Sequence, residues 1–385
     1  MLFSQIIGQE HTKSRLISTV NEQRIPHAML FKSSEGVGEL GLAIAYAQYI
    51  CCENRSESDS CGKCPSCVKY AKLSHPDLHF VFPIIKPKGQ PSAVCDNFIK
   101  DFRDIFTENP YFSLEQWFLK ISGDAKRGMI YANESQEIIR KLSLKTYESD
   151  YKVMIIWLPE RMNETCANKL LKILEEPPEK TLFILVSNQP NEMLTTILSR
   201  AQHFNIPNLS NEEILSSILA DYNSEITKED ALNIARIANG SYLRAKNLVI
   251  GGGEQKQNFE KFVQIMRLAW LVGNKKDYAS LKTLRKWSED MALTSVGRER
   301  QKTFLSYSQR MIRENYIYNL QNPELNYLSQ DENSFATNFS RFINERNVED
   351  LITEFSLAER HIEQNVNAKM VFFDLVLKII VLLKR

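Results

Sequence analysis

Four short apolar runs stand out in the first half of the chain, at residues 28–31, 77–82, 152–157 and 181–187. Several of them contain β-branched residues, which favour strands. Between these runs lie longer segments in which apolar residues recur every three or four positions, as on one face of an amphipathic helix. Strands that alternate with helices predict a mostly parallel, doubly wound sheet. We therefore expect an α/β domain over residues 1–207.

After Pro207 the strand pattern gives way to helices. Two segments there open with a Ser or Thr that is followed three residues later by an acidic residue, at 210–213 and 227–230. This spacing is typical of a helix N-terminus, because the hydroxyl and the carboxylate satisfy backbone N–H groups of the first turn. We expect a small helical domain over residues 208–250.

A third region follows a glycine-rich run at 251–257, which predicts a flexible break. Residues 258–385 carry helical patterns throughout, so we expect an all-α domain. Its last segment, 369–385, is the most apolar of the chain, but Asp374 and Lys378 interrupt it. It falls short of the ~18–20 uninterrupted apolar residues that cross a bilayer. We expect a buried helix there and no membrane contact.

Composition and charge narrow the class of protein. A chain of 385 residues has room for two or three domains. The net charge of +1 gives no global basic field, so any contact with nucleic acid would have to be local. The N-terminus lacks the basic-then-apolar order of a secretory signal. Seven cysteines, three of them in one short run, indicate a reducing cytoplasm and a metal site rather than a disulfide framework.

The cysteine run is the strongest candidate for a metal site. Residues 52–67 have the spacing C-x8-C-x2-C-x2-C, which involves Cys52, Cys61, Cys64 and Cys67. Four thiolates can enclose Zn²⁺ tetrahedrally, and such a closed set leaves no position for a substrate. We therefore expect a structural zinc ion. The neighbouring Cys51 competes with Cys52 as the fourth ligand.

The stretch "KSSEGVGELG" at 32–41 has the strand–loop–helix setting of a phosphate-binding loop. The pattern G-x-x-x-x-G-K-[ST] places Gly38 at its second glycine, Glu39 where the lysine belongs and Leu40 where the hydroxyl belongs. Gly36 and Gly38 can still offer backbone N–H groups to an anion. A carboxylate about 4 Å from a phosphate charge costs roughly 4 kcal/mol at an effective dielectric constant near 20. This loop is therefore a degenerate nucleotide site.

Several motifs together resemble bacterial clamp-loader subunits of the AAA+ superfamily, and most of all their delta-prime type. They are "IIGQEHTKSRL", "RIPHAMLF", the cysteine insertion, "SHPDLHFV", "NKLLKILEEPP", "ILSRAQHF" and "NVNAKMVFFDLVLKI". The resemblance covers most of the chain except 84–127 and 270–360. It implies a P-loop NTPase-like domain over 1–207 that carries the zinc module and an insertion at 84–127. A helical lid and an oligomerising collar would follow.

The resemblance also implies which catalytic groups an active member of the family needs. An acidic pair should follow the strand at 152–157, but those positions hold Trp157 and Leu158. Together with Glu39 and Leu40, four required groups are absent. We expect no ATP, no Mg²⁺ and no intrinsic ATPase activity. Two alternatives stay open: an active gamma/tau-type ATPase, and a zinc-bearing adaptor that binds nucleic acid.

Arg200, in "LSRAQ", is the one residue that the resemblance assigns to catalysis. It would project into the ATP site of a neighbouring subunit as an arginine finger within the DNA polymerase III holoenzyme. The alternative is a surface arginine tied to carboxylates of its own domain. Asn188 and Arg244 match nucleotide-sensing positions of the family. Without a nucleotide to sense, we expect both side chains to serve in packing or in hydrogen bonds between domains. The implied partners are gamma/tau-type and delta-type subunits and, indirectly, the sliding clamp and primer–template DNA.

Overall fold

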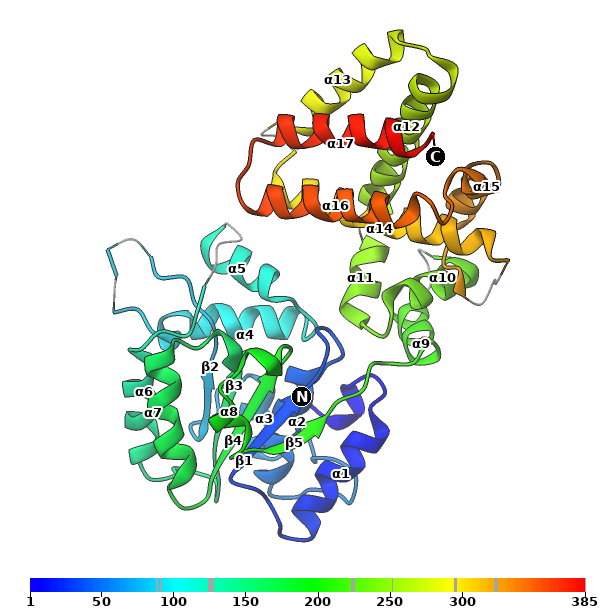
Figure 1. Cartoon of the computed structure of the whole chain (residues 1–385). Coiled ribbons are helices and arrows are strands. Elements are labelled where there is room, and N and C mark those ends of the chain that lie inside the picture. Colours follow the sequence, from blue (N-terminus) through cyan, green and yellow to red (C-terminus); the bar gives the residue numbers. More distant parts are fainter. Residues whose placement is uncertain are drawn as a thin grey trace. The chain divides into compact units, whose positions relative to one another are not determined.

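The computed structural model describes residues 1–87, 89–90, 92–123, 128–222, 226–250, 252–293, 296–321 and 325–384. The chain divides into two compact units, Met1–Asn247 and Leu248–Arg385 (Figure 1). The predicted division of the first unit at 207/208 is not tested by this grouping and stays a prediction.

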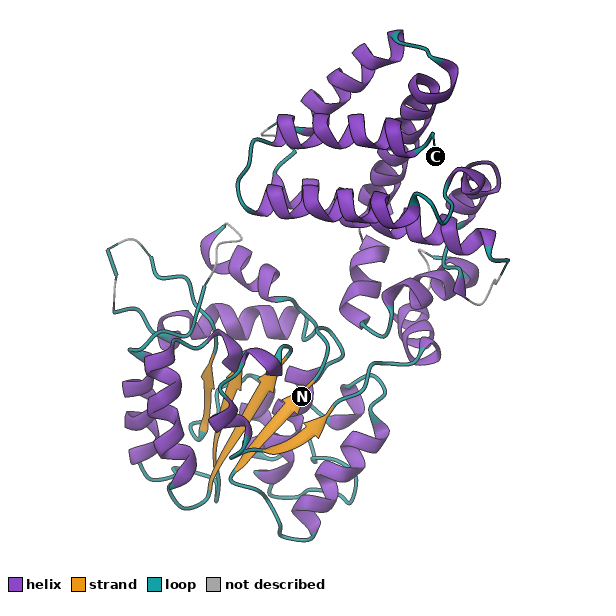
Figure 2. Ribbon diagram, in the orientation of Figure 1, coloured by secondary structure: helices purple, strands orange, loops and turns teal. Residues whose placement is uncertain are grey.

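A parallel sheet forms the centre of the first unit (Figure 2). Its five strands lie in the order β2-β3-β4-β1-β5. They are β1 (Ala28–Lys32), β2 (Leu78–Val81), β3 (Lys152–Trp157), β4 (Thr181–Ser187) and β5 (Gln202–Asn205). All residues of β3 and β4 are buried, which explains their continuous apolar runs. The predicted α/β fold class is confirmed.

The edge strand β5 was not predicted from the pattern of apolar residues. Only Phe204 of its four residues is buried, so the segment has no apolar run. It is a strand because it pairs in parallel with β1, where Phe31 lies opposite Phe204. Its existence therefore depends on a partner about 170 residues away in the sequence, as the register shows.

Helices surround the sheet. Those of the α/β part are α1 (Glu10–Asn21), α2 (Glu39–Ile50), α3 (Pro65–Ala71), α4 (Ile99–Glu108), α5 (Leu114–Ser122), α6 (Glu134–Ser143), α7 (Glu164–Glu175) and α8 (Thr195–Leu198). Every residue of α2 is buried, because this helix contacts strands β3 and β4 as well as helices α1 and α3. Helix α2 starts directly at the degenerate phosphate loop, so the loop is held by the core.

The helical end of the first unit contains α9 (Asn211–Tyr222), α10 (Lys228–Ala238) and the start of α11 (Tyr242–Ile250). Both predicted N-terminal caps form. The Glu213 N–H donates to Ser210 Oγ at 3.2 Å, and the Asp230 N–H donates to Thr227 Oγ1 at 3.1 Å.

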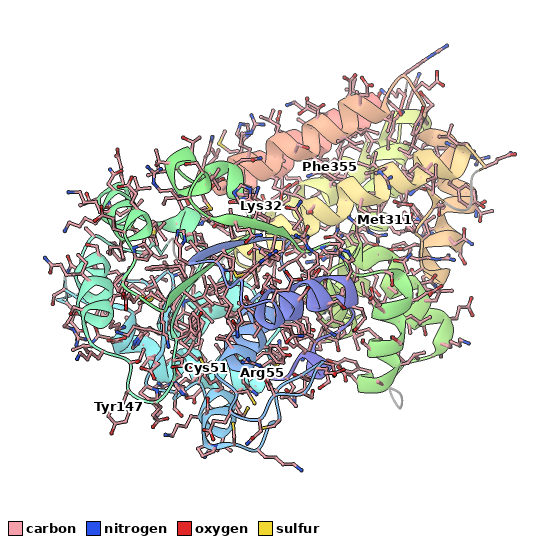
Figure 3. All side chains as sticks on the ribbon, turned by 90° about the horizontal axis from the view of Figure 1, so that it is seen from below. Lys32, Cys51, Arg55, Tyr147, Met311 and Phe355 are labelled. Atoms are coloured by element: carbon pink, nitrogen blue, oxygen red, sulfur yellow. The ribbon has the colours of Figure 1, made fainter. Side chains whose placement is uncertain are left out.

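The second unit is helical. It consists of α12 (Gly252–Lys275), α13 (Ala279–Met291), α14 (Arg298–Asn319), α15 (Gln330–Phe339), α16 (Val348–Glu363) and α17 (Ala368–Leu382). Met311 of α14 and Phe355 of α16 are completely buried in its core (Figure 3). The predicted C-terminal helix is confirmed as α17, with Phe372 and Val376 fully buried. Within the described part of the chain, no helix has both the length and the apolar character needed to cross a membrane.

The predicted flexible break at 251–257 is wrong where the structure describes it, because α12 already begins at Gly252. Glycine disfavours a helix interior by about 1 kcal/mol per residue relative to alanine. This helix is 24 residues long, however, and its later turns bury Phe262, Ile265 and Met266 in the core. Tertiary packing of the later turns outweighs the weak local propensity of the first turn. Residue 251 itself lies outside the described residues.

Candidate functional site

The loop that the sequence predicts to be a degenerate phosphate loop lies between β1 and α2. Gly36 and Gly38 have φ angles of 83° and 93°, which residues other than glycine rarely adopt. These conformations turn the backbone N–H groups of the loop inward, toward the start of α2. The loop has therefore kept the backbone shape that its glycines favour.

The carboxylate of Glu39 occupies the N–H groups of this loop. The Gly36 N–H donates to Oε1 at 3.3 Å and the Val37 N–H donates to Oε2 at 3.1 Å. Glu39 is only 6% exposed, and burial raises the pKa of its carboxyl above the usual range, against the effect of these hydrogen bonds. A side chain of the protein thus takes donors that a phosphate would use in an active loop.

Asn188 joins the loop from the end of β4. Its Nδ2 lies 3.2 Å from Glu39 Oε1 and 3.4 Å from Ser33 Oγ. The backbone N–H of Asn188 in turn donates to Glu160 Oε1 at 3.0 Å. Glu160 therefore caps the backbone after β4. The amide that the resemblance matches to a nucleotide sensor is engaged with the protein's own loop.

Residues 241–243 cover the loop from the helical end of the same unit. Ser241 Oγ donates to the Glu35 carbonyl at 2.8 Å, and the Tyr242 N–H donates to the Gly36 carbonyl at 2.9 Å. A Cβ atom added at Gly36 would lie 2.5 Å from Leu243 Cβ. The start of α11 is thus packed directly on the loop. Arg244 follows on the exposed side of this helix, and its backbone N–H donates to Ser241 Oγ.

The segment 84–127, for which the sequence suggested no role, covers the loop from another side. A Cβ atom added at Gly38 would lie 3.1 Å from the ring of Tyr111. The Tyr111 hydroxyl accepts a hydrogen bond from the Ile7 N–H at 3.0 Å, and its ring lies 5.0 Å from that of Tyr242. Two parts of the chain distant in sequence therefore meet above the same glycine-rich turn.

The positions expected for an acidic pair are apolar and covered. Trp157 ends β3 and is 3% exposed, and its ring lies 5.1 Å from Phe112 and 6.0 Å from Phe102. Leu158 is also buried, and its N–H donates to the Val186 carbonyl. Aromatic side chains of the 84–127 segment therefore cover Trp157, which lies where the resemblance implies a carboxylate for a metal ion. The aromatic richness of this segment was the only sequence signal for that packing.

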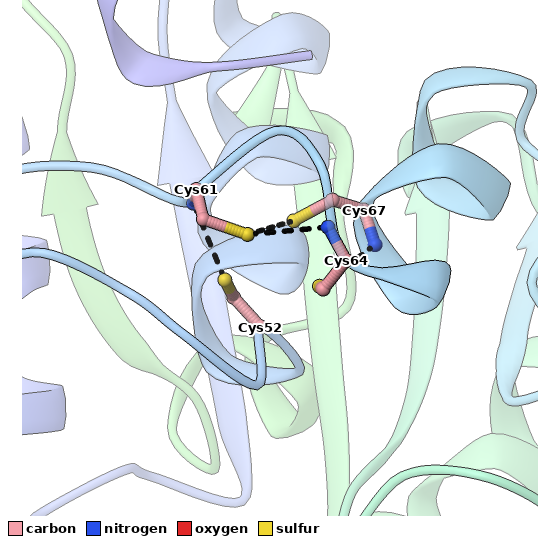
Figure 4. Close-up of side chains that lie close together, drawn as sticks. All are labelled: Cys52, Cys61, Cys64 and Cys67. Carbon is pink, nitrogen blue, oxygen red and sulfur yellow. Dashed lines mark hydrogen bonds between the residues drawn. The ribbon is translucent and has the colours of Figure 1, made fainter.

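The four predicted cysteines lie together. The Sγ atoms of Cys52, Cys61, Cys64 and Cys67 are all within 4.8 Å of one another (Figure 4). Backbone N–H groups point at the sulfurs, as from Cys64 to Cys61 Sγ at 3.3 Å. Hydrogen bonds from the backbone N–H groups of Lys63 and Cys64 lower the pKa of the Cys61 thiol to about 6. This donor set suits a metal ion held by thiolates.

Cys51, the competing fourth ligand, is not among the four sulfurs that lie together. The Tyr70 hydroxyl donates to Cys51 Sγ at 3.2 Å, and burial raises the pKa of the Cys51 thiol to about 11. Cys52 supplies the fourth sulfur instead. Cys51 and Cys52 are adjacent in the chain but have different surroundings. The spacing of the motif alone did not show which of the two joins the cluster.

Arg200 lies just after α8, which contacts α7. Its Nη2 donates to Glu175 Oε1 at 2.5 Å, and its Nη1 donates to the Thr196 carbonyl at 2.9 Å. The side chain of Arg200 is 34% exposed and that of Glu175 is 49% exposed. The arginine is thus accessible and is also paired with a carboxylate of its own domain, the arrangement that the sequence left open as an alternative.

Comparison with models of known protein families shows to which family the chain belongs. The family model described as "DNA polymerase III, delta subunit" matches residues 8–210, more than half of the chain. The chain belongs to this family. Its matched region spans the parallel sheet, the degenerate loop, the cysteine cluster and Arg200.

Curated relatives of this chain include delta′ subunits and tau/gamma subunits of DNA polymerase III. A DNA polymerase III subunit delta′ of Haemophilus influenzae is 29% identical over 249 residues, which are 64% of this chain and 62% of that protein. A subunit delta′ of Bacillus subtilis is 30% identical over 195 residues, 50% of this chain and 46% of that protein. A subunit tau/gamma of H. influenzae is 24% identical over 242 residues, 62% of this chain and 29% of that protein. The chain thus spans less than two thirds of the length of these relatives.

Proposed function

We propose that this chain is a non-hydrolysing, delta-prime-type subunit of a bacterial DNA polymerase III clamp loader that acts in the cytoplasm. It would assemble with gamma/tau-type and delta-type subunits and help to load the sliding clamp on primer–template DNA during replication. The observation that carries this proposal is the Glu39 carboxylate, which takes the N–H groups of its own phosphate loop.

The rest of the loop's surroundings support the same conclusion. The loop lacks the lysine and the hydroxyl of an active site, and the acidic pair is replaced by Trp157 and Leu158. Tyr111 and the start of α11 pack on the two glycine positions. An ATP molecule would have to displace a buried carboxylate and several packed side chains, and would find no partner for Mg²⁺ at the end of β3.

Within this proposal, Arg200 acts on a neighbour's ATP. An arginine finger stabilises charge on the transferred phosphoryl group and is worth about 10³–10⁵ in rate. Arg200 suits this role because it is partly exposed at the end of a short helix and not enclosed in its own degenerate site. Its contact with Glu175 is partly exposed to water and uses only some of the five guanidinium N–H donors, so others remain for a phosphate.

We further propose that the cysteine cluster holds one structural zinc ion. Four sulfurs within 4.8 Å of one another form a closed donor set, with no position left for a substrate. Zinc would fix the loop at 52–64 against the start of α3, whose first turn receives the Cys64 cap.

The alternative with some support is an active gamma/tau-type ATPase, because tau/gamma subunits are among the relatives. That function requires Mg²⁺-dependent ATP binding by the isolated chain. The third possibility, a zinc-bearing adaptor for nucleic acid, has only the cysteine cluster in its favour and lacks a basic surplus of charge.

The test is reconstitution with the gamma/tau-type and delta-type subunits of the same organism. We expect the chain to co-purify with them, to bind no ATP by itself, and to raise ATP hydrolysis by the complex. The Arg200→Ala variant should assemble equally well but hydrolyse ATP more slowly. Tight Mg²⁺-dependent ATP binding by the isolated chain would favour the gamma/tau alternative, and a failure to co-purify would reject the clamp-loader role.

A further inference from the structure

Glu175 holds the guanidinium of Arg200 from a rigid point of the fold. It is the last residue of α7, and Pro177 and Pro178 follow shortly after, so the helix cannot continue. The preceding Leu174 is 1% exposed and anchors this end of the helix in the core. The carboxylate therefore projects from a fixed backbone position.

The position of Glu175 is unfavourable for α7 taken by itself. The C-terminal end of a helix carries a partial negative charge, which repels a carboxylate. A cation beside it relieves this repulsion, and Arg200 is that cation, at 2.5 Å. The contact with Arg200, and not the helix itself, therefore accounts for a negative charge at the end of α7.

The guanidinium is fixed by two elements at once. Nη2 donates to Glu175 of α7, while Nη1 donates to the Thr196 carbonyl of α8 at 2.9 Å and approaches Ser199 Oγ at 3.4 Å. Acceptors on two different elements define the plane of the group, which a single contact would leave free to rotate. A guanidinium has five N–H donors, and these three acceptors take at most three of them. Donors therefore remain for the oxygen atoms of a phosphate.

We infer that Glu175 is a positioning residue for Arg200, and that it orients the guanidinium for contact with a phosphate group of a neighbouring subunit's nucleotide. This inference rests on the proposed function, because it assigns Glu175 a role only if Arg200 serves a neighbour. Glu175 itself touches no nucleotide. Glu175 restricts the orientations of the Arg200 side chain before the neighbour's site forms, so less conformational entropy is lost when the arginine contacts the phosphate.

The test is a double-mutant cycle in the reconstituted clamp-loader complex. Glu175→Ala should lower kcat for ATP hydrolysis about tenfold at the neighbouring site, with KM little changed, because a misplaced catalytic group affects the transition state more than binding. Glu175→Gln should restore part of the rate, because its amide oxygen can still accept from Nη2. In the Arg200→Ala background, Glu175→Ala should have no further effect. Glu176→Ala changes the adjacent exposed glutamate and is the matched control.

A second measurement needs only the isolated chain. Phenylglyoxal modifies free guanidinium groups, so Glu175→Ala should raise the rate of modification at Arg200 several-fold, followed by mass spectrometry of the peptide. An unchanged rate would overturn the contact itself.

The outcomes separate this inference from the proposed function. If Arg200→Ala slows hydrolysis but Glu175→Ala does not, only the positioning role fails. If Glu175→Ala speeds hydrolysis, the carboxylate competes with phosphate and the positioning role is rejected. An effect of Glu175→Ala that persists without Arg200 would show a merely structural role and would also reject it. If neither variant changes hydrolysis while the chemical modification still responds, the arginine finger fails, and the positioning role fails with it.

Discussion

The side-chain amide of Asn188 donates to the carboxylate of Glu39, with 3.2 Å between Nδ2 and Oε1. Asn188 directly follows β4, and Glu39 is the first residue of α2, almost 150 residues earlier in the chain. In an active phosphate-binding loop, the position of Glu39 would hold a lysine that contacts phosphate. Here the two side chains face each other, and the loop between β1 and α2 is closed by the protein's own atoms.

Removal of the Glu39 carboxylate should destabilise the protein. In Glu39→Ala the buried N–H groups of Gly36 and Val37 lose their acceptor, and each unsatisfied group costs about 1–3 kcal/mol. We expect the free energy of unfolding to fall by about 2 kcal/mol, measured by urea denaturation. Glu212→Ala, at an exposed position in the first turn of α9, should change it by less than about 0.5 kcal/mol. Equal stability of the two variants would show that Glu39 does not hold the loop.

The aromatic cover of Trp157 predicts a second stability effect. Phe112→Ala should lower the free energy of unfolding by about 3 kcal/mol, because it removes a buried ring that lies 5.1 Å from Trp157 and leaves a cavity. Phe112→Leu should cost less than about 1.5 kcal/mol, since it keeps most of the volume. Leu119→Ala, which changes an exposed leucine of α5, is the control. A small effect of Phe112→Ala would mean that the 84–127 segment does not pack on β3 as described.

Metal content tests the cysteine cluster directly. We expect about one zinc ion per chain by elemental analysis of protein purified without chelator. Cys64→Ser should lose most of the metal and unfold at a lower temperature, whereas Cys51→Ala should retain the metal because Cys51 bonds to Tyr70 outside the cluster. Loss of zinc from Cys51→Ala but not from Cys52→Ala would reverse the choice of the fourth ligand.

His79 on β2 should make stability depend on pH. Burial, together with the nearby charges of Lys141 and Lys152, lowers the pKa of His79 from 6.5 to about 4. Between these two values the unfolded chain binds more protons than the folded one, so stability is fully present above about pH 6.5 and is lost as the pH falls toward 4. The loss is of order 2 kcal/mol, since solvent screens part of the shift.

The measurement is thermal or urea unfolding at pH 7.5 and pH 5 for the protein and for His79→Gln. The variant should show a smaller difference between the two pH values, because it has no group to protonate at this position. His11→Gln, which changes an exposed histidine of α1, should keep the full pH dependence. A His79→Gln variant with unchanged pH dependence would contradict the prediction and point to another titrating group.

The sequence determined the features that depend on neighbours in the chain. The apolar runs predicted strands β1 to β4, the hydroxyl–acid pairs predicted two helix starts, and the cysteine spacing predicted a cluster of four sulfurs. The same local pattern led to the prediction that Glu39 and Leu40 stand where an active phosphate loop has its lysine and hydroxyl. Each of these features rests on side-chain period, capping chemistry or ligand spacing, all of which act over a few residues.

The tertiary structure decided everything that depends on contacts between distant segments. β5 is a strand because β1 pairs with it, and α12 begins at Gly252 because its later turns pack in a core. Likewise, the sequence left open whether Arg200 pairs within its own domain, and only the fold brings it to Glu175. The loop before α2 follows the same rule. The sequence shows Glu39 where a phosphate loop would have its lysine, but the Glu39 carboxylate, Tyr111 and the start of α11 come together around the loop only in the folded chain.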